Sequence, residues 1–296
     1  MAVNDIRSRA NLVANTARQF SPSIWADCPI SDLKANPTKG LFFFDDFDSN
    51  PLIGTQTTQI GYSTYKVFAT ANAAVTPVST VNSVEIGNGI AAFTHAADND
   101  SASLAQAYPA FMLSGSTSTS GKLWFECRIA VKSLLTLRNG FLVGLGESDL
   151  FTLATAVPFN ADAAVPTNGG SFIGFNKWEI VSTTAAATTS LPGGINTSRT
   201  DRATSFTQIQ ADAAIMSAAF TFIKLGMVYD PYNTAKAVRF FADNLELSSY
   251  ITPTQLAATT NLKANAVGLI IASVAAASVS TDATYLDWWA CAQMSV

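Results

Sequence analysis

The sequence predicts an all-β protein, a two-sheet antiparallel jelly-roll sandwich with an N-terminal arm. From residue 41 onward, segments that alternate apolar and polar residues are separated by turns rich in Gly, Pro and Asn, the pattern of half-buried strands. The long stretches between them, rich in Thr, Ala, Gly and Asn, lack the 3.6-residue period of helices. The 296 residues suffice for one large all-β domain. We therefore assign residues 1–40 to the arm and 41–296 to the sandwich.

The arm is expected to hold one short helix followed by an extended segment. Asn4 or Asp5 can cap the helix. Proline fixes φ and removes a hydrogen-bond donor, so Pro22, Pro29 and Pro37 indicate irregular, extended chain after it. The same segment carries apolar side chains that a free tail does not need: Ile24, Trp25, Ile30 and Leu33. This composition favours an arm that packs on a partner, and the alternative is a frayed terminus.

The first strand is expected in residues 41–50, LFFFDDFDSN. Acids beside aromatics are typical of a sugar-cleaving cleft, and also of a first sandwich strand that turns out into solvent. Because successive side chains of a strand point to opposite faces, we expect Phe42 and Phe44 to face the core and Phe43 to face the other side.

A strong alternation lies in residues 121–131. One face carries Leu123, Phe125, Cys127 and Ile129. The other carries Lys122, Trp124, Glu126 and Arg128, which we interpret as an exposed charged stripe.

Six further strands are expected. Two lie at 140–147 and 171–181. Residues 219–230 and 237–247 should form an antiparallel hairpin through the Asp-, Pro- and Asn-containing link 230–236. Residues 265–275 and 284–294 are apolar on both faces, as expected of central strands.

Charge and cysteine content exclude several classes. The net charge is −4 and the 17 basic residues form no run, which argues against nucleic-acid binding. The most apolar stretch, 264–279, is too short and too rich in Ala and Ser to span a bilayer, and no secretory signal is evident. Cys28, Cys127 and Cys291 are odd in number and far apart, so neither a disulfide framework nor a zinc site is expected.

Four segments together carry a family resemblance. They are FFFDDFDS near the start, GKLWFECRI in the middle, IKLGMVYDP leading to VRFFADNLEL, and YLDWWACAQ at the end. In this order they resemble the concanavalin A-like lectin/glucanase jelly roll, as in laminarinase-type hydrolases and laminin-G-like modules. Asp243–Asn244 and Asp287–Trp288 match its hairpin and last-strand positions. The resemblance covers about residues 41–296 and implies the same sandwich.

The acids do not form the catalytic set that the family's hydrolases need. A retaining glucanase uses two carboxyl groups about 5–5.5 Å apart, which the family places on one strand as Glu, Asp and Glu at close spacing. Glu126 stands alone on its strand, and Glu147 and Asp149 have no third acid beside them.

Other catalytic groups are no better placed. Asp45 and Asp46 are adjacent and point to opposite faces, while Asp46 and Asp48 share a face only at the strand's edge. The single histidine, His95, has no recognisable nucleophile beside it in sequence. We therefore predict no catalytic, cofactor-binding or metal-binding residues, and a protein that is not an enzyme.

The resemblance also implies one structural metal. In such jelly rolls, the last strand's aspartate helps to hold calcium against the first strand, and the matching residues in this chain are Asp287 with Asp45 or Asp46. Calcium takes six to eight oxygen ligands, and only two or three can be named. We therefore expect no cofactor and keep structural calcium as an alternative.

Two functions from different classes fit these observations. Charged residues make up only 13% of the chain, which suits a surface covered by neighbours in an assembly. The general character resembles decoration (cement) proteins of tailed phages. This favours a non-enzymatic virion structural protein on the outer capsid surface, a dimer or trimer that binds the major capsid protein or another virion protein.

The alternative is a carbohydrate-binding, lectin-like module of a tail, receptor-binding protein or adhesin. In that module, aromatic rings would stack on sugars. The candidate rings are Trp124, Trp178 and Tyr108.

Overall fold

The computed structural model describes the chain in fifteen ranges, which leave gaps between them. They are residues 19–47, 65–69, 74–78, 89–95, 100–113, 120–132, 139–147, 159–160, 163–166, 172–177, 194–200, 206–214, 222–257, 266–275 and 283–296.

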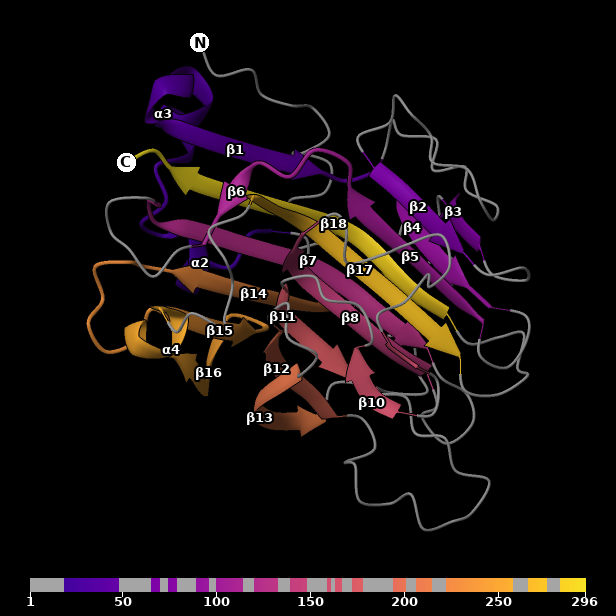
Figure 1. The fold of residues 1–296 in the computed structure, drawn as a ribbon. Helices are drawn as coiled ribbons and strands as arrows, with labels where there is room; N and C mark the ends of the chain where they lie inside the picture. Colours follow the sequence, from indigo (N-terminus) through magenta and orange to yellow (C-terminus); the bar gives the residue numbers. More distant parts are fainter. Residues whose placement is uncertain are drawn as a thin grey trace.

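Two antiparallel sheets face each other across one apolar core (Figure 1). We call them sheet A and sheet B. Sheet A contains β1 (Gly40–Asp45), β3 (Ala74–Val78), β4 (Ile90–Thr94), β7 (Leu123–Lys132), β14 (Ile223–Tyr229), β15 (Val238–Ala242), β16 (Leu245–Ile251) and β18 (Ala283–Met294). Sheet B contains β2 (Tyr65–Ala69), β5 (Ser101–Gln106), β6 (Phe111–Met112), β8 (Asn139–Gly146), β11 (Phe172–Lys177), β12 (Gly194–Thr200), β13 (Phe206–Ala214) and β17 (Ala266–Ala275).

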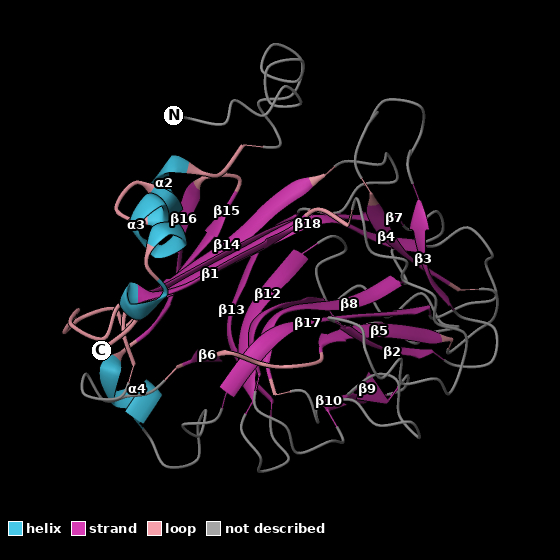
Figure 2. Ribbon diagram, turned by 90° about the horizontal axis from the view of Figure 1, so that it is seen from above, coloured by secondary structure: helices cyan, strands magenta, loops and turns pink. Residues whose placement is uncertain are grey.

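Sheet A runs in the order β16-β15-β14-β7-β18-β4-β3, with β1 also paired to β18. Sheet B runs β13-β12-β11-β8-β17-β5-β2, with β6 also paired to β17. A two-stranded sheet of β9 (Phe159–Asn160) and β10 (Ala163–Pro166) lies beyond sheet B, on the side away from sheet A (Figure 2). The predicted all-β sandwich is therefore confirmed.

The predicted central strands and hairpin are confirmed. β17 lies between β8 and β5, and β18 lies between β7 and β4. β14 pairs with β15 antiparallel, as expected for the hairpin. The strand predicted over 237–247 is instead two strands, because Asp243 and Asn244 both take positive φ, 44° and 71°, and turn the chain from β15 into β16. Asp and Asn tolerate this conformation better than other non-glycine residues.

The three phenylalanines of β1 face the opposite way from the prediction. Phe43 stacks on Trp289, with ring centroids 4.6 Å apart, and packs against the core between the sheets. Phe42 packs on the outer face of sheet A. On the same side, the ring centroid of Phe44 lies 6.3 Å from that of Trp288. Three identical residues in a row carry no alternation, so the sequence could not identify the core face.

The described part of the arm folds back onto the outer face of sheet A (Figure 2). It contains α2 (Pro22–Trp25), α3 (Ile30–Ala35) and a 3-10 turn (Pro37–Lys39). The expectation of an extended segment is wrong for these residues, because Pro22 lies at the helix N-terminus, where its missing N–H leaves no bond unmade. The helix expected earlier in the arm lies outside the described residues.

The arm also changes the character of β7. Leu123, Phe125, Cys127 and Ile129 face the core as predicted. Glu126 and Arg128 on the opposite face are nevertheless buried, and the arm contacts Glu126. The predicted exposed charged stripe is therefore wrong. One further helix, α4 (Pro253–Ala257), follows β16. Within the described residues, no helix combines the length and apolarity that crossing a bilayer requires.

Candidate functional site

Asp45 closes the end of β1 through hydrogen bonds to both of its carboxylate oxygens. Its Oδ1 accepts a hydrogen bond from the Phe47 backbone N–H (2.7 Å), and its Oδ2 accepts one from the Tyr65 hydroxyl (2.6 Å). Tyr65 in turn accepts from Trp289 Nε1 at 2.7 Å. Burial raises the pKa of Asp45, and the bonds from Tyr65 and Phe47 oppose that rise. Both carboxylate oxygens are therefore committed to holding β1 against its neighbours. Asp48 lies outside the described residues.

Asp287 is also engaged by a protein group. Its Oδ2 accepts from Arg128 at 2.5 Å, and both side chains are buried. The pair lies where the β18–β7 register shifts, between Leu286 and Trp288. Among the described residues, no group of three or more His, Cys, Asp or Glu side chains could hold a metal ion. This donor set does not fit the six to eight oxygens that calcium takes.

His95 does have a serine partner, which sequence spacing had not revealed. His95 Nε2 lies 2.8 Å from Ser273 Oγ, and Ser273 Oγ lies 2.8 Å from Thr284 Oγ1. All three side chains are buried, so a substrate cannot reach the hydroxyl. Burial lowers the pKa of His95 to about 4, which keeps the ring neutral. The chain of polar groups links β17 of sheet B to β18 of sheet A across the core.

Glu126 binds the arm. Its side chain is 0% exposed, and its Oε2 accepts from the Ser21 backbone N–H (3.0 Å) and from Trp25 Nε1 (2.8 Å). Burial raises its pKa, and the bonds from Ser21 and Trp25 oppose that rise. Glu147 is buried too, and Asp149 lies outside the described residues. Of the carboxylates considered for catalysis, Asp45 and Glu126 therefore accept hydrogen bonds that hold parts of the fold together.

The three aromatic rings predicted to stack on sugars differ in how accessible they are. Trp124 is buried under the arm, where its Nε1 donates to Asp27 Oδ1 at 2.8 Å, so it is not available to a ligand. Tyr108 is 73% exposed on the connection between β5 and β6. Trp178 lies outside the described residues.

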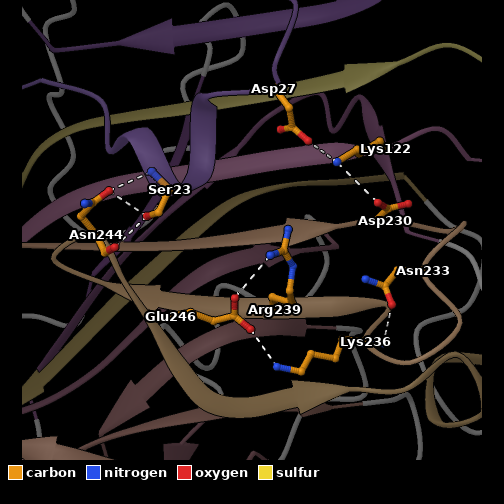
Figure 3. A network of polar contacts seen from close by, with 9 residues as sticks. All are labelled: Ser23, Asp27, Lys122, Asp230, Asn233, Lys236, Arg239, Asn244 and Glu246. Atoms are coloured by element: carbon orange, nitrogen blue, oxygen red, sulfur yellow. Dashed lines mark hydrogen bonds and ion pairs between the residues drawn. The ribbon is translucent and has the colours of Figure 1, made fainter.

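A cluster of partly exposed side chains lies beside the arm, at the β15–β16 edge of sheet A, and Figure 3 shows its charged members Lys236, Arg239 and Glu246. We call it the edge patch and define it as Lys236, Arg239, Glu246 and Tyr250. Glu246 accepts from Lys236 Nζ at 2.9 Å and from Arg239 at 3.3 Å. Lys236 Nζ also lies 5.2 Å from the centre of the Tyr250 ring, which is 41% exposed.

The edge patch rests on ordered backbone. Arg239 is opposite Tyr250 in the β15–β16 ladder, so both project from paired strands. The preceding loop is held by Asn233, whose Oδ1 accepts from the backbone N–H groups of Ala235 (3.0 Å) and Lys236 (2.9 Å). Tyr232, 66% exposed, lies on the same loop. A ring and three charged groups are thus held with little freedom to lose on binding.

Sequence reasoning missed the edge patch because it treated 237–247 as one strand, which left Tyr250 outside any predicted element. A signal was present. The Asp–Asn pair at 243–244 is typical of a tight hairpin turn and would have placed a second strand after it.

Comparisons with known proteins establish the fold. The lectin UEA-II complexed with galactose matches with a TM-score of 0.51 at 8% identity, over 86% of this chain and 99% of that one. The carbohydrate recognition domain of Emp46p in its potassium-bound form matches with a TM-score of 0.50 at 10% identity, over 84% and 98%. The fold is thus the concanavalin A-like lectin jelly roll.

The remaining comparisons add little. A carbohydrate esterase from the Shiga toxin-encoding bacteriophage phi24B matches over 79% of this chain and 91% of that one, at 13% identity. Its TM-score of 0.42 is too low to support an argument. No protein-family model matches the sequence. No curated protein gives a significant match.

Proposed function

We propose that the protein binds carbohydrate, with the edge patch as its binding site. The observation that carries the proposal is the surrounding of Tyr250, an exposed ring beside the ammonium of Lys236 and the carboxylate of Glu246. The apolar face of a pyranose ring packs on an aromatic side chain. Its hydroxyl groups both donate and accept hydrogen bonds, so a cation and a carboxylate beside the ring can fix its orientation.

The known binding properties of the structural neighbours agree with this proposal. UEA-II was solved with galactose, and the matched part of Emp46p is a carbohydrate recognition domain. At 8% and 10% identity these likenesses concern the fold, so the argument for a site comes from this chain's own residues. These observations support the lectin-like alternative over the virion role that composition favoured.

The direct test is a glycan array that includes neutral and acidic oligosaccharides, followed by titration of the best-bound glycan. Loss of the stacking ring in Tyr250→Ala should weaken that binding by on the order of tenfold, which corresponds to about 1.4 kcal/mol.

The matched control is Tyr108→Ala, which removes an exposed ring from a connection of sheet B. It should bind like the unmodified protein. If Tyr108→Ala loses binding and Tyr250→Ala keeps it, the site is misplaced. If no glycan binds the unmodified protein, the proposed function fails.

A second candidate is the virion structural role, with the major capsid protein as partner and the outer capsid surface as location. The specific observation in its favour is the 13% content of charged residues, which suits a surface covered by neighbours. Co-sedimentation with capsids at fixed stoichiometry would support it, and its absence would count against it.

The arm needs a carefully chosen truncation in that experiment. From the sequence alone, deletion of residues 1–40 is expected to leave a folded domain that no longer binds particles. Because Ile24, Trp25 and Leu33 are buried on sheet A, that deletion would uncover Trp124 and Trp288. A variant that lacks only residues 1–18 removes the first part of the arm and keeps the part that covers sheet A.

A further inference from the structure

We propose that the edge patch selects acidic sugars, whose ring carboxylate binds Lys236 and Arg239. This selectivity would operate at the proposed carbohydrate site, so it rests on the proposed function and names the class of sugar that the same site takes. Three features of the patch support it. They are its charge balance, the N–H donors that its cations leave open, and the fixed positions of its side chains.

The edge patch carries more positive than negative charge. Lys236 and Arg239 share the single carboxylate of Glu246, at 2.9 Å and 3.3 Å (Figure 3). Two cations with one carboxylate leave one positive charge without a counter-charge inside the patch. This local excess is opposite in sign to the net charge of the whole chain, which is −4. An anionic group on a ligand would therefore complete the charge balance of the patch.

The acids on the two turns beside the patch are bound to other groups. Asp230, on the turn before β15, pairs with Lys122 at 3.4 Å (Figure 3). Asp243, on the turn after β15, accepts a hydrogen bond through Oδ1 from the Lys224 backbone N–H at 2.9 Å. The excess positive charge of the patch is therefore available to a ligand that brings its own carboxylate.

The two cations also have N–H groups to spare. A lysine ammonium has three N–H donors, and an arginine guanidinium has five. In the part of the chain that the structure describes, the Lys236 ammonium and the Arg239 guanidinium each donate one hydrogen bond, in both cases to Glu246. Their side chains are 40% and 27% exposed, so a ligand can reach them. A planar carboxylate matches the fork geometry of a guanidinium and forms charge-assisted bonds with it.

The β15–β16 ladder fixes the positions of these side chains. Its register shifts between Arg239 and Phe241, so that Tyr250 lies opposite Arg239 and Glu246 lies opposite Phe241. A shift of this kind redirects side chains, and such irregularities are common beside binding sites. The Arg239 guanidinium also lies 5.6 Å from the centre of the buried Phe241 ring. Arg239 is thus held between a ring and a carboxylate before a ligand arrives.

The turn that leads into β16 is held by the arm. The Ser23 hydroxyl donates to the Asn244 backbone carbonyl at 2.8 Å, and the Ser23 backbone N–H donates to Asn244 Oδ1 at 2.9 Å (Figure 3). Glu246 follows Asn244 by two residues, so the arm helps to fix where its carboxylate lies. A site that is set in advance in this way loses little conformational entropy when it binds.

These positions suggest how an acidic sugar would bind. Its ring would stack on Tyr250, which is 41% exposed and lies 5.2 Å from Lys236 Nζ. Its carboxylate would accept from the open donors of Lys236 and Arg239, and Glu246 would accept from a sugar hydroxyl. A neutral hexose can make the same stacking contact but offers no group for a charge-assisted bond.

The test compares sugars that differ in one group. The methyl glycosides of glucuronic acid and glucose carry a carboxylate and a hydroxymethyl group, respectively, on the same ring, and those of galacturonic acid and galactose form a second pair. Titration of the full-length protein with each sugar, followed by ligand-observed NMR, gives the dissociation constants. In at least one pair we expect the uronic acid to bind on the order of tenfold more tightly than its neutral partner. This preference should shrink as salt is added.

Three variants locate the preference on the molecule. Lys236→Gln and Arg239→Gln each remove one positive charge from the patch and should reduce the preference for the uronic acid several-fold. Lys236→Gln suffices if Arg239→Gln fails to fold, because Lys236 is 40% exposed. The matched control is Lys34→Gln, which removes an exposed charge from α3, a helix that lies against β1 and away from β16 (Figure 1). It should keep the full preference.

The outcomes separate the selectivity from carbohydrate binding itself. Equal binding of the acidic and the neutral sugar in both pairs, or array glycans that bind without a carboxylate, would overturn the selectivity and leave carbohydrate binding in place. A preference that survives both patch variants, or that Lys34→Gln abolishes, would put the carboxylate elsewhere and overturn the proposal. If neither the four sugars nor the array glycans bind, the proposed function fails, and the selectivity fails with it.

Discussion

The outer face of sheet A has two regions with similar residues and different surroundings. Under the arm, Glu126 is fully buried and binds Trp25. At the edge patch, Glu246 binds Lys236 and Arg239 in partial contact with solvent. Where the arm covers the sheet, charged and aromatic side chains are buried and hold the arm in place. Where it ends, the same residue types remain accessible to a ligand. Five measurements test this contrast.

The largest expected difference concerns the two arginine ion pairs. Arg128→Ala removes the buried ion-pair partner of Asp287 and should lower the free energy of unfolding by about 3–5 kcal/mol. Arg239→Ala removes a partly exposed pair with Glu246 and should cost less than about 1 kcal/mol. Urea denaturation of both variants measures the two losses, and equal losses would contradict the contrast.

The aromatic side chains provide the next comparison. Trp25→Ala should lower the free energy of unfolding by about 3–5 kcal/mol, because it opens a cavity between arm and sheet. Tyr250→Ala removes a ring that is already 41% exposed and should cost less than about 1 kcal/mol. A Trp25→Ala variant that melts like the unmodified protein would show that the arm does not contribute to stability.

The losses of stability caused by replacing the two glutamates should differ by a smaller amount. Glu126→Ala leaves the Ser21 N–H and Trp25 Nε1 buried without their acceptor, which should cost about 2 kcal/mol. Glu246→Ala should cost less than about 1 kcal/mol, since its partners can turn to water. Thermal unfolding of the pair checks this, and a larger loss at Glu246 would reverse the assignment of roles.

The smallest expected effect is a pH dependence at Glu126. Burial raises its folded-state pKa above the unfolded value, so the folded state binds the proton more tightly and gains stability as pH falls through that pKa. The charged group that acts on Glu126 is Lys224, which lowers the pKa.

Glu126→Gln keeps an acceptor for Trp25 and carries no charge. It should therefore be at least as stable as the unmodified protein at pH 7, and this advantage should shrink toward pH 4. Chemical denaturation at the two pH values measures the difference, and an advantage that grows on acidification would contradict the expected sign.

The sequence predicted strands with a clear pattern, such as β7, because a strand's alternation is local, whereas strands such as β4, β5 and β12 were not predicted individually. Residues 121–131 needed only their own pattern to reveal the core face of β7. What covers the opposite face could not be predicted in the same way, since Glu126 meets Ser21 and Trp25 across 105 and 101 residues of chain. Trp124 within the charged stripe was the one local sign that this face is covered.

The candidate site was harder to predict for a related reason. The edge patch is formed where a turn at positive φ brings Glu246 and Tyr250 beside Lys236 and Arg239. None of these residues matches a motif by itself. Their significance comes from the ladder between β15 and β16 and from their position beyond the arm.

The central claim is that carbohydrate binds the uncovered edge and not the covered part of sheet A. Hydrogen–deuterium exchange with and without the best-bound array glycan tests it most directly. We expect added protection at residues 236–250 and unchanged exchange at residues 20–35. Protection confined to residues 20–35, or to the connection around Tyr108, would contradict the claim.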